Sequence, residues 1–178
     1  AMLGSSLSLA LTGSASGADV YFKPSVDPVI SAYYGAPYVW ADSMGNSVGM
    51  PGASDVAYIS GFKVQLDSTV NLNLNVTNSR LILSRKVQIN LNSLTYTVTG
   101  RTDLNTDAQV TVGGGNFNTS ILNFLSNSPE TSFTIKDDAK VRVSNTSPIY
   151  YSVVMEGSSH FNVHGSLVCT GQNFAIGV

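Results

Sequence analysis

The sequence is poor in charge and in long apolar runs, and each shortage excludes a class of protein. Charged residues make up 11% of the 178 residues, against roughly 25% in an ordinary soluble domain. Nine Lys and Arg are scattered along a chain of net charge −2, so there is no basic stripe of the kind that nucleic acid requires. No window approaches the ~18 consecutive apolar residues of a membrane helix. We therefore expect neither a nucleic-acid partner nor insertion into a membrane.

Cysteine and histidine are also scarce. Cys169 is the single cysteine, so the chain cannot form an internal disulfide or a Cys-x-x-Cys pair. Its aliphatic neighbours indicate a small buried hydrophobe rather than a reactive thiol. His160 and His164 are the two histidines, and strand alternation places them on one face with Asn162, as an exposed polar ladder. We predict no metal site and no cofactor.

Short strands of alternating polar and aliphatic residues dominate what is present. Ser, Thr and Asn replace the Lys and Glu that surface helices carry, which favours strands and turns over helices. The alternation begins at 6–12 and is nearly continuous after Phe62. The main alternating windows are 70–76, 87–91, 94–98, 108–112, 139–143 and 161–163. The chain is therefore predicted to be all-β.

The spacing of these windows predicts stacked coils. Val110 follows Val87 by 23 residues, and Phe161 follows Val141 by 20. A period of roughly 20 residues is what one turn of a parallel β-helix or β-solenoid requires. An antiparallel β-sandwich or jelly roll is the alternative, because its strands also alternate between regularly spaced turns.

One interval is longer than the others and predicts an insertion at 113–129. Within it, Ile121, Leu122, Phe124 and Leu125 fit a single helical turn better than a strand. Residues 62–178 then form the solenoid with its insertion. Residues 3–61 are predicted as an aromatic, proline-rich N-terminal region of β-strand and loop. Four of the six prolines lie within 23–55, which predicts loop and turn for that stretch. Residues 1–2 look like a cloning remnant.

The N-terminal region, residues 3–61, carries the candidate binding residues. Tyr and Trp on irregular backbone suit sugar rings, and a nearby carboxylate accepts hydrogen bonds from sugar hydroxyls. The candidate carbohydrate-binding residues are Tyr33, Tyr34, Tyr38, Trp40 and Asp42. In the alternative, Tyr33, Tyr38 and Trp40 turn inward, where they cap the end of the solenoid or pack between chains.

Catalysis is not favoured by the acidic residues. Hydrolysis of a glycosidic bond needs two carboxyl groups ~5–9 Å apart, and the chain has only Glu130 and Glu156 as glutamates. Glu130 is predicted on a solvated loop. Glu156 precedes His160 and His164 at helical spacing, but the intervening Gly and Ser indicate turn and strand, where that alignment is lost. The prediction leans away from an enzyme.

A solenoid leaves open strand edges at its two ends, and few charges are present to protect them. We therefore expect a homo-oligomer, most naturally a trimer whose chains run side by side.

The Asn-rich alternation at 70–78 and the Asp-Ala-x-Val-x-Val pattern at 107–112 and 138–143 resemble the β-helical parts of bacteriophage tailspikes and tail fibres. The resemblance covers 62–169. It implies a virion segment that binds cell-surface polysaccharide or links a binding domain to the particle. Passenger domains of bacterial autotransporter adhesins are similar in the same windows. An adhesin on the bacterial cell surface and a polysaccharide-degrading spike domain are the alternatives.

Overall fold

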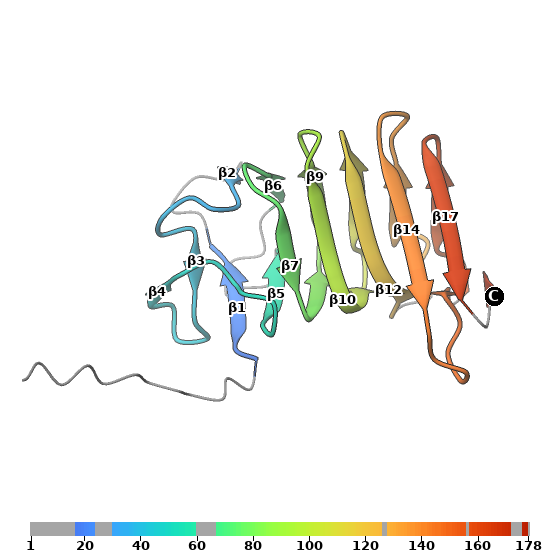
Figure 1. Ribbon diagram of the computed structural model, residues 1–178, viewed down its shortest axis with the longest axis horizontal. Helices are drawn as coiled ribbons and strands as arrows, with labels where there is room; N and C mark the ends of the chain where they lie inside the picture. Colours follow the sequence, from blue (N-terminus) through green and yellow to red (C-terminus); the bar gives the residue numbers. More distant parts are fainter. Residues whose placement is uncertain are drawn as a thin grey trace, which may run out of the picture.

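The computed structural model describes residues 17–23, 30–59, 67–125, 128–155, 157–171 and 176–177. All regular structure in these ranges is β-strand, stacked along an elongated molecule as about five turns of a β-solenoid (Figure 1). The strand predicted at 6–12 and the remnant at 1–2 lie outside the described residues.

The larger sheet has twelve strands. Its main path runs β17 (Ser166–Gly171), β14 (Lys140–Asn145), β12 (Asn116–Phe124), β10 (Thr95–Leu104), β8 (Arg80–Leu83), β5 (Val56–Ile59), β1 (Asp19–Phe22), β3 (Trp40–Ala41) and β4 (Ser47–Val48). Off this path, β7 (Val76–Asn78) pairs with β10, β15 (Val153–Val154) with β12, and β18 (Ile176–Gly177) with β15.

The smaller sheet has six strands. They run in the order β16 (His160–Val163), β13 (Ser132–Ile135), β11 (Gln109–Gly113), β9 (Lys86–Asn90), β6 (Ser68–Asn71) and β2 (Ile30–Tyr33). Among the described strands, every pair is parallel except β1–β3 and β3–β4. The predicted solenoid is therefore confirmed, and the antiparallel sandwich is wrong.

Each middle coil turns a corner inside the larger sheet. The register of β10 against β12 shifts between Val98 and Arg101, and within this stretch Gly100 lies against the preceding coil. A Cβ on Gly100 would come 2.5 Å from the carbonyl oxygen of Ser79. The bend lets one long strand supply two segments of the larger sheet, while the smaller sheet takes one segment from each coil.

The core consists of inward-facing residues at equal positions of successive coils. Val87, Val110, Phe133 and Phe161 align in register across the smaller sheet. A row of aromatic rings continues through the core, with neighbouring centroids 4.7–6.2 Å apart. The row is Phe22, Trp40, Tyr34, Tyr96, Phe117, Phe133 and Phe161. Each fully buried side chain of this size stabilises the fold by roughly 1.5–3 kcal/mol.

The helical turn predicted within 113–129 is wrong, because residues 116–124 form β12. Val110 aligns with Phe133, 23 residues further on, in the smaller sheet. Val141 instead belongs to the larger sheet, where it aligns with Phe117. The long interval from Val110 to Val141 therefore joins positions on two different sheets, so its length does not indicate an insertion. Apolar burial against both neighbouring coils keeps β12 extended.

The stacked sheet begins before Phe62, since β1 and β5 of the proline-rich region already pair in parallel. The β3–β4 hairpin then covers the free edge of β1 with antiparallel strands. This N-terminal cap, residues 30–55, also contains β2, and the rest of it is turn and irregular backbone. The hairpin covers the β1 edge of the larger sheet, so that β4 is the outermost strand of that sheet and β2 is the outermost strand of the smaller sheet.

Candidate functional site

The aromatic residues predicted as one binding site divide between the core and the surface. Tyr34 and Trp40 are 0% and 1% exposed, whereas Tyr33 and Tyr38 are 58% and 80% exposed. The Nε1 of Trp40 donates to the carbonyl oxygen of Tyr34 at 2.7 Å. The inward alternative therefore holds for Trp40 but not for the exposed Tyr33 and Tyr38, and Tyr34 does not share a surface with the other two tyrosines.

Tyr34 instead belongs to a buried polar cluster, the Asn78 network. The hydroxyls of Tyr34 and Tyr96 donate to Oδ1 of Asn78 at 2.7 and 2.8 Å. The Nδ2 of Asn78 donates to the carbonyl oxygens of Pro51 and Gly52 at 3.2 and 3.1 Å. Burial raises the pKa of both tyrosines above the ordinary value of 10.0. The network fastens the cap to the coils and leaves these hydroxyls unavailable to a ligand.

Asp42 also has a local structural role. Its Oδ1 accepts from the backbone N–H groups of Met44 and Asn46, each at 2.9 Å, and its Oδ2 accepts from Nδ2 of Asn46. The side-chain bond from Asn46 is the largest cause that lowers the pKa of Asp42. The carboxylate organises the turn between β3 and β4.

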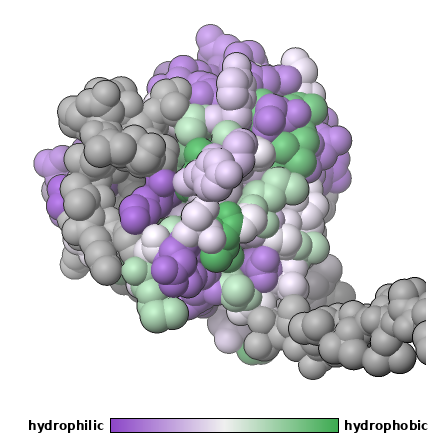
Figure 2. All heavy atoms as spheres, turned by 90° about the vertical axis from the view of Figure 1, so that its left-hand side faces the viewer, coloured by the Kyte–Doolittle hydropathy of each residue, from purple (hydrophilic) through white to green (hydrophobic). Residues whose placement is uncertain are grey.

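Tyr33 and Tyr38 remain as exposed residues of the cap. Met44 and Met50 are exposed in the same region. Viewed end-on, the described surface of the cap shows apolar and polar residues interspersed (Figure 2). The two tyrosines are accessible on the surface of the cap.

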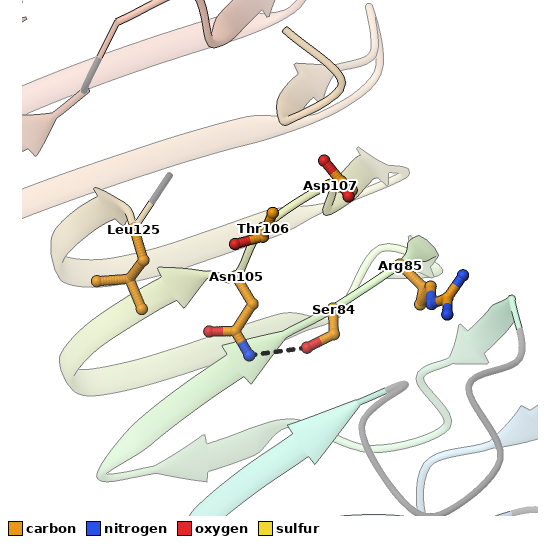
Figure 3. A pocket seen from close by; sticks show the side chains of 6 residues that line it. All are labelled: Ser84, Arg85, Asn105, Thr106, Asp107 and Leu125. Carbon is orange, nitrogen blue, oxygen red and sulfur yellow. Dashed lines mark hydrogen bonds between the residues drawn. The ribbon is translucent and has the colours of Figure 1, made fainter. Parts of the chain in front are cut away.

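A groove opens where successive coils pass from the larger to the smaller sheet, and we call it the corner groove. It has a volume of about 550 Å³. Figure 3 places Arg85 and Asp107 toward one end and Leu125 toward the other. The described residues that line it are Ser84, Arg85, Asn105, Thr106, Asp107 and Leu125.

The corner groove is built from the connections that join the larger sheet to the smaller one in three successive coils. Its described lining residues are Ser84 and Arg85 from the first connection, Asn105, Thr106 and Asp107 from the second, and Leu125 from the start of the third. Arg85 and Asp107 both adopt positive φ, at 59° and 61°, where the chain reverses sharply. Their backbones are therefore held in a conformation that few residues adopt freely.

Hydrogen bonds between coils fix the groove walls. The Nδ2 of Asn105 donates to Oγ of Ser84 at 2.9 Å, as Figure 3 shows. The backbone N–H of Asp107 donates to Oγ1 of Thr131 at 3.0 Å, and Ser128 donates to Oδ1 of Asp107 at 2.6 Å. These bonds pre-order a concave polar surface before any ligand binds.

The sequence indicates that Asp107 enters a turn before Ala108, but it does not identify the residues that face Asp107 across the groove. The available signal was the polar run at 105–107 between two alternating windows. That signal locates a turn, but the facing residues come from other coils. The fold alone brings Ser84 and Leu125 beside this turn.

A smaller hollow of about 380 Å³ is lined by Lys136, Asp137, Asp138 and His164. The aspartates form the turn between β13 and β14. His160 and His164 are exposed, and Nδ2 of Asn162 donates to Oγ1 of Thr134 at 3.3 Å. Within the ranges given above, no three His, Cys, Asp or Glu side chains are placed to hold a metal ion.

Two further groups of residues bear on function. Glu130 is exposed and accepts from Nε2 of Gln109 at 3.3 Å, while Glu156 lies outside the described residues. Ile149, Tyr150 and Tyr151 are exposed on the loop after β14, which projects from the row of coils (Figure 1). Sequence reasoning missed this loop, although the Pro-Ile-Tyr-Tyr run was its visible signal.

Comparison with protein-family models, curated proteins and solved structures gave no match. In the described part of the chain, no helix has the length and apolar character needed to cross a membrane.

Proposed function

We propose that the chain is a structural and attachment segment of a viral spike or fibre, and that it holds cell-surface polysaccharide in the corner groove. The observation that carries the proposal is the groove itself, a pre-ordered polar hollow on a stiff solenoid. Its volume falls within the roughly 300–1,000 Å³ typical of ligand sites.

The chemistry of the groove suits a sugar. Ser84 and Thr106 supply hydroxyls, Asn105 an amide and Arg85 a guanidinium, and these groups match the donors and acceptors of a sugar hydroxyl. Leu125 is 46% exposed at the other end and offers an apolar contact for the C–H face of a ring. Exposed Tyr33 and Tyr38 give a second place for sugar stacking on the cap.

The groove favours binding over cleavage. Asp107 is the one acidic side chain among its described lining residues, and Ser128 already donates to this carboxylate. Hydrolysis of a glycosidic bond by the usual route needs a second carboxyl group nearby. An attachment role needs only the hydrogen-bonding surface.

Assembly as a trimer in the virion is part of the proposal. The outer face of the smaller sheet carries mainly Thr, Asn, Gln and Ser, which allows chains to lie side by side there with little unpaired charge buried. In the last coil, β16 is the outermost strand of the smaller sheet, and such an edge is a place where another chain can pair.

The test is a binding screen against purified capsule and lipopolysaccharide from a panel of bacteria. The chain should bind at least one polysaccharide and leave its size distribution unchanged after long incubation. Cleavage of the bound polysaccharide, or an absence of binding across the panel with folded protein, would contradict the proposal.

A further inference from the structure

Two arginines on the outer face of the larger sheet share one buried carboxylate. Asp103 is fully buried, and its Oδ2 accepts from Nε of Arg80 at 2.6 Å and from Nε of Arg101 at 2.9 Å. Its Oδ1 accepts from Nδ2 of Asn123 at 2.9 Å. These partners come from β8, β10 and β12, so the carboxylate is saturated and holds both guanidinium groups in place.

The charges of this cluster do not balance. Arg80 and Arg101 directly precede the paired residues Leu81 and Thr102, so they lie side by side on neighbouring strands. Like charges in that arrangement destabilise a sheet. Asp103 supplies one negative charge for two positive charges. Within the ranges that the structure describes, neither guanidinium forms an ion pair with a second carboxylate.

Another acid on the same face does not correct the imbalance. Asp19 pairs with Val56 of β5, and Val56 in turn pairs with Arg80. Asp19 is therefore two strands away from the nearer arginine. Its charge acts on Tyr58, whose pKa is raised first by burial and then by Asp19.

Both arginine side chains are partly exposed, although Arg80 contacts Asp103 through Nη2 as well as Nε. Their side chains are 35% and 45% exposed. A guanidinium has five N–H donors in a rigid fork, and Arg101 contacts Asp103 through Nε. The terminal nitrogens of Arg101 are thus held at the surface in a fixed orientation.

We propose that Arg80 and Arg101 bind an oxyanion group of a ligand that reaches this face. Guanidinium forks match oxyanions in charge and geometry, and the excess positive charge is neutralised when one binds. Because Asp103 already orders both side chains, binding costs less entropy than it would for free arginines. The inference rests on this face alone and is independent of the proposed function.

The geometry selects among oxyanions. Neighbouring strands lie about 4.8 Å apart, so the two guanidinium groups are separated by about one strand spacing. A tetrahedral phosphate or sulfate group has enough oxygens to accept from both arginines at once. A monocarboxylate accepts fully from one fork at a time and should bind more weakly.

The experiment is an NMR titration of arginine Nε–H signals with sodium phosphate, sulfate or acetate, at constant ionic strength in chloride. Phosphate and sulfate should shift the Arg80 and Arg101 signals saturably, and more tightly than acetate. Arg101→Gln should weaken phosphate binding about tenfold or more. Arg101→Lys, which keeps the charge but loses the fork, should also weaken it.

Arg142→Gln is the matched control, because Arg142 is exposed on the same sheet in β14. It should leave phosphate affinity unchanged, and two-dimensional spectra verify that each variant is folded. Equal phosphate affinity in the Arg101→Gln and Arg142→Gln proteins would overturn the proposal, as would the absence of any saturable shift in the wild-type protein.

Discussion

Single polar residues inside the solenoid decide how the cap is joined to the coils. Asn78 occupies an inward position that Val98, Thr119 and Val143 fill in later coils. A buried amide is tolerated there because each of its atoms has a partner. At this position a polar side chain replaces an apolar one, and it forms hydrogen bonds with Tyr34, Tyr96 and the turn at 51–52.

Asn78→Ala should therefore be much more damaging than Tyr96→Phe. The alanine removes the acceptor that the two buried hydroxyls share and the amide that donates to the carbonyl groups of Pro51 and Gly52, at roughly 2–5 kcal/mol in total. The phenylalanine removes one bond while Tyr34 still satisfies Asn78, at about 1 kcal/mol. Urea denaturation measures both. Similar losses for the two variants would show that Asn78 does not hold the network.

The buried tyrosines also make stability depend on alkaline pH. Their pKa values are raised in the folded state, so the unfolded chain loses these protons first as pH rises. Stability is thus unaffected below about pH 9 and falls above pH 10, by about 1.4 kcal/mol per pH unit for each tyrosine. Tyr96→Phe should reduce that slope in urea titrations between pH 9 and 11. An unchanged slope would contradict the burial of Tyr96.

At the scale of elements, the corner inside the larger sheet depends on one close approach. The N–H of Gly100 donates to the carbonyl oxygen of Ser79 at 2.8 Å, and no side chain fits between the two coils. The same glycine lies where the register of β10 shifts. The bend therefore depends on a missing Cβ as much as on the alternating pattern.

Gly100→Ala should destabilise the protein by roughly 1–3 kcal/mol, because the new Cβ would overlap the Ser79 carbonyl and force the coils apart. Gly49→Ala is the control, since no atom lies within 4 Å of the Cβ it would add. Thermal unfolding compares the two. Equal melting temperatures would contradict the contact between these coils.

Alternation located most of these elements, but it did not assign them to a sheet. The windows at 87–91, 108–112 and 139–143 coincide closely with β9, β11 and β14, and the window at 94–98 covers the first part of β10. Val110 and Val141 have the same local pattern yet face the core from different sheets. Period two cannot distinguish the sheets, because each strand of a solenoid has one face inward. That ambiguity produced the apparent insertion at 113–129.

The candidate site was less predictable than the fold for the same reason. Tyr33 and Tyr34 are adjacent in sequence, and their side chains point to opposite sides of the backbone, so one is exposed and the other buried. Composition identified an aromatic segment but not this direction. The corner groove joins Ser84, Asn105 and Leu125, which are about one coil apart in sequence. Only the stacking brings them together.

At the scale of the whole molecule, the cap covers one end of the solenoid and the polar faces are left for assembly. Multi-angle light scattering of the purified chain should give three times the 18.8 kDa chain mass. Lateral contact between weakly charged faces should make this mass insensitive to salt. A mass of one chain at micromolar concentration would contradict the trimer.

The central claim is that the corner groove holds a polysaccharide. The most direct test is the affinity of the wild-type chain for the polysaccharide identified in the binding screen, compared with the affinities of Thr106→Ala and Thr97→Ala. Thr106 lines the groove, whereas Thr97 faces outward from the larger sheet. Thr106→Ala should lower the affinity about tenfold, and Thr97→Ala should leave it unchanged. Equal affinities for all three proteins would contradict the account.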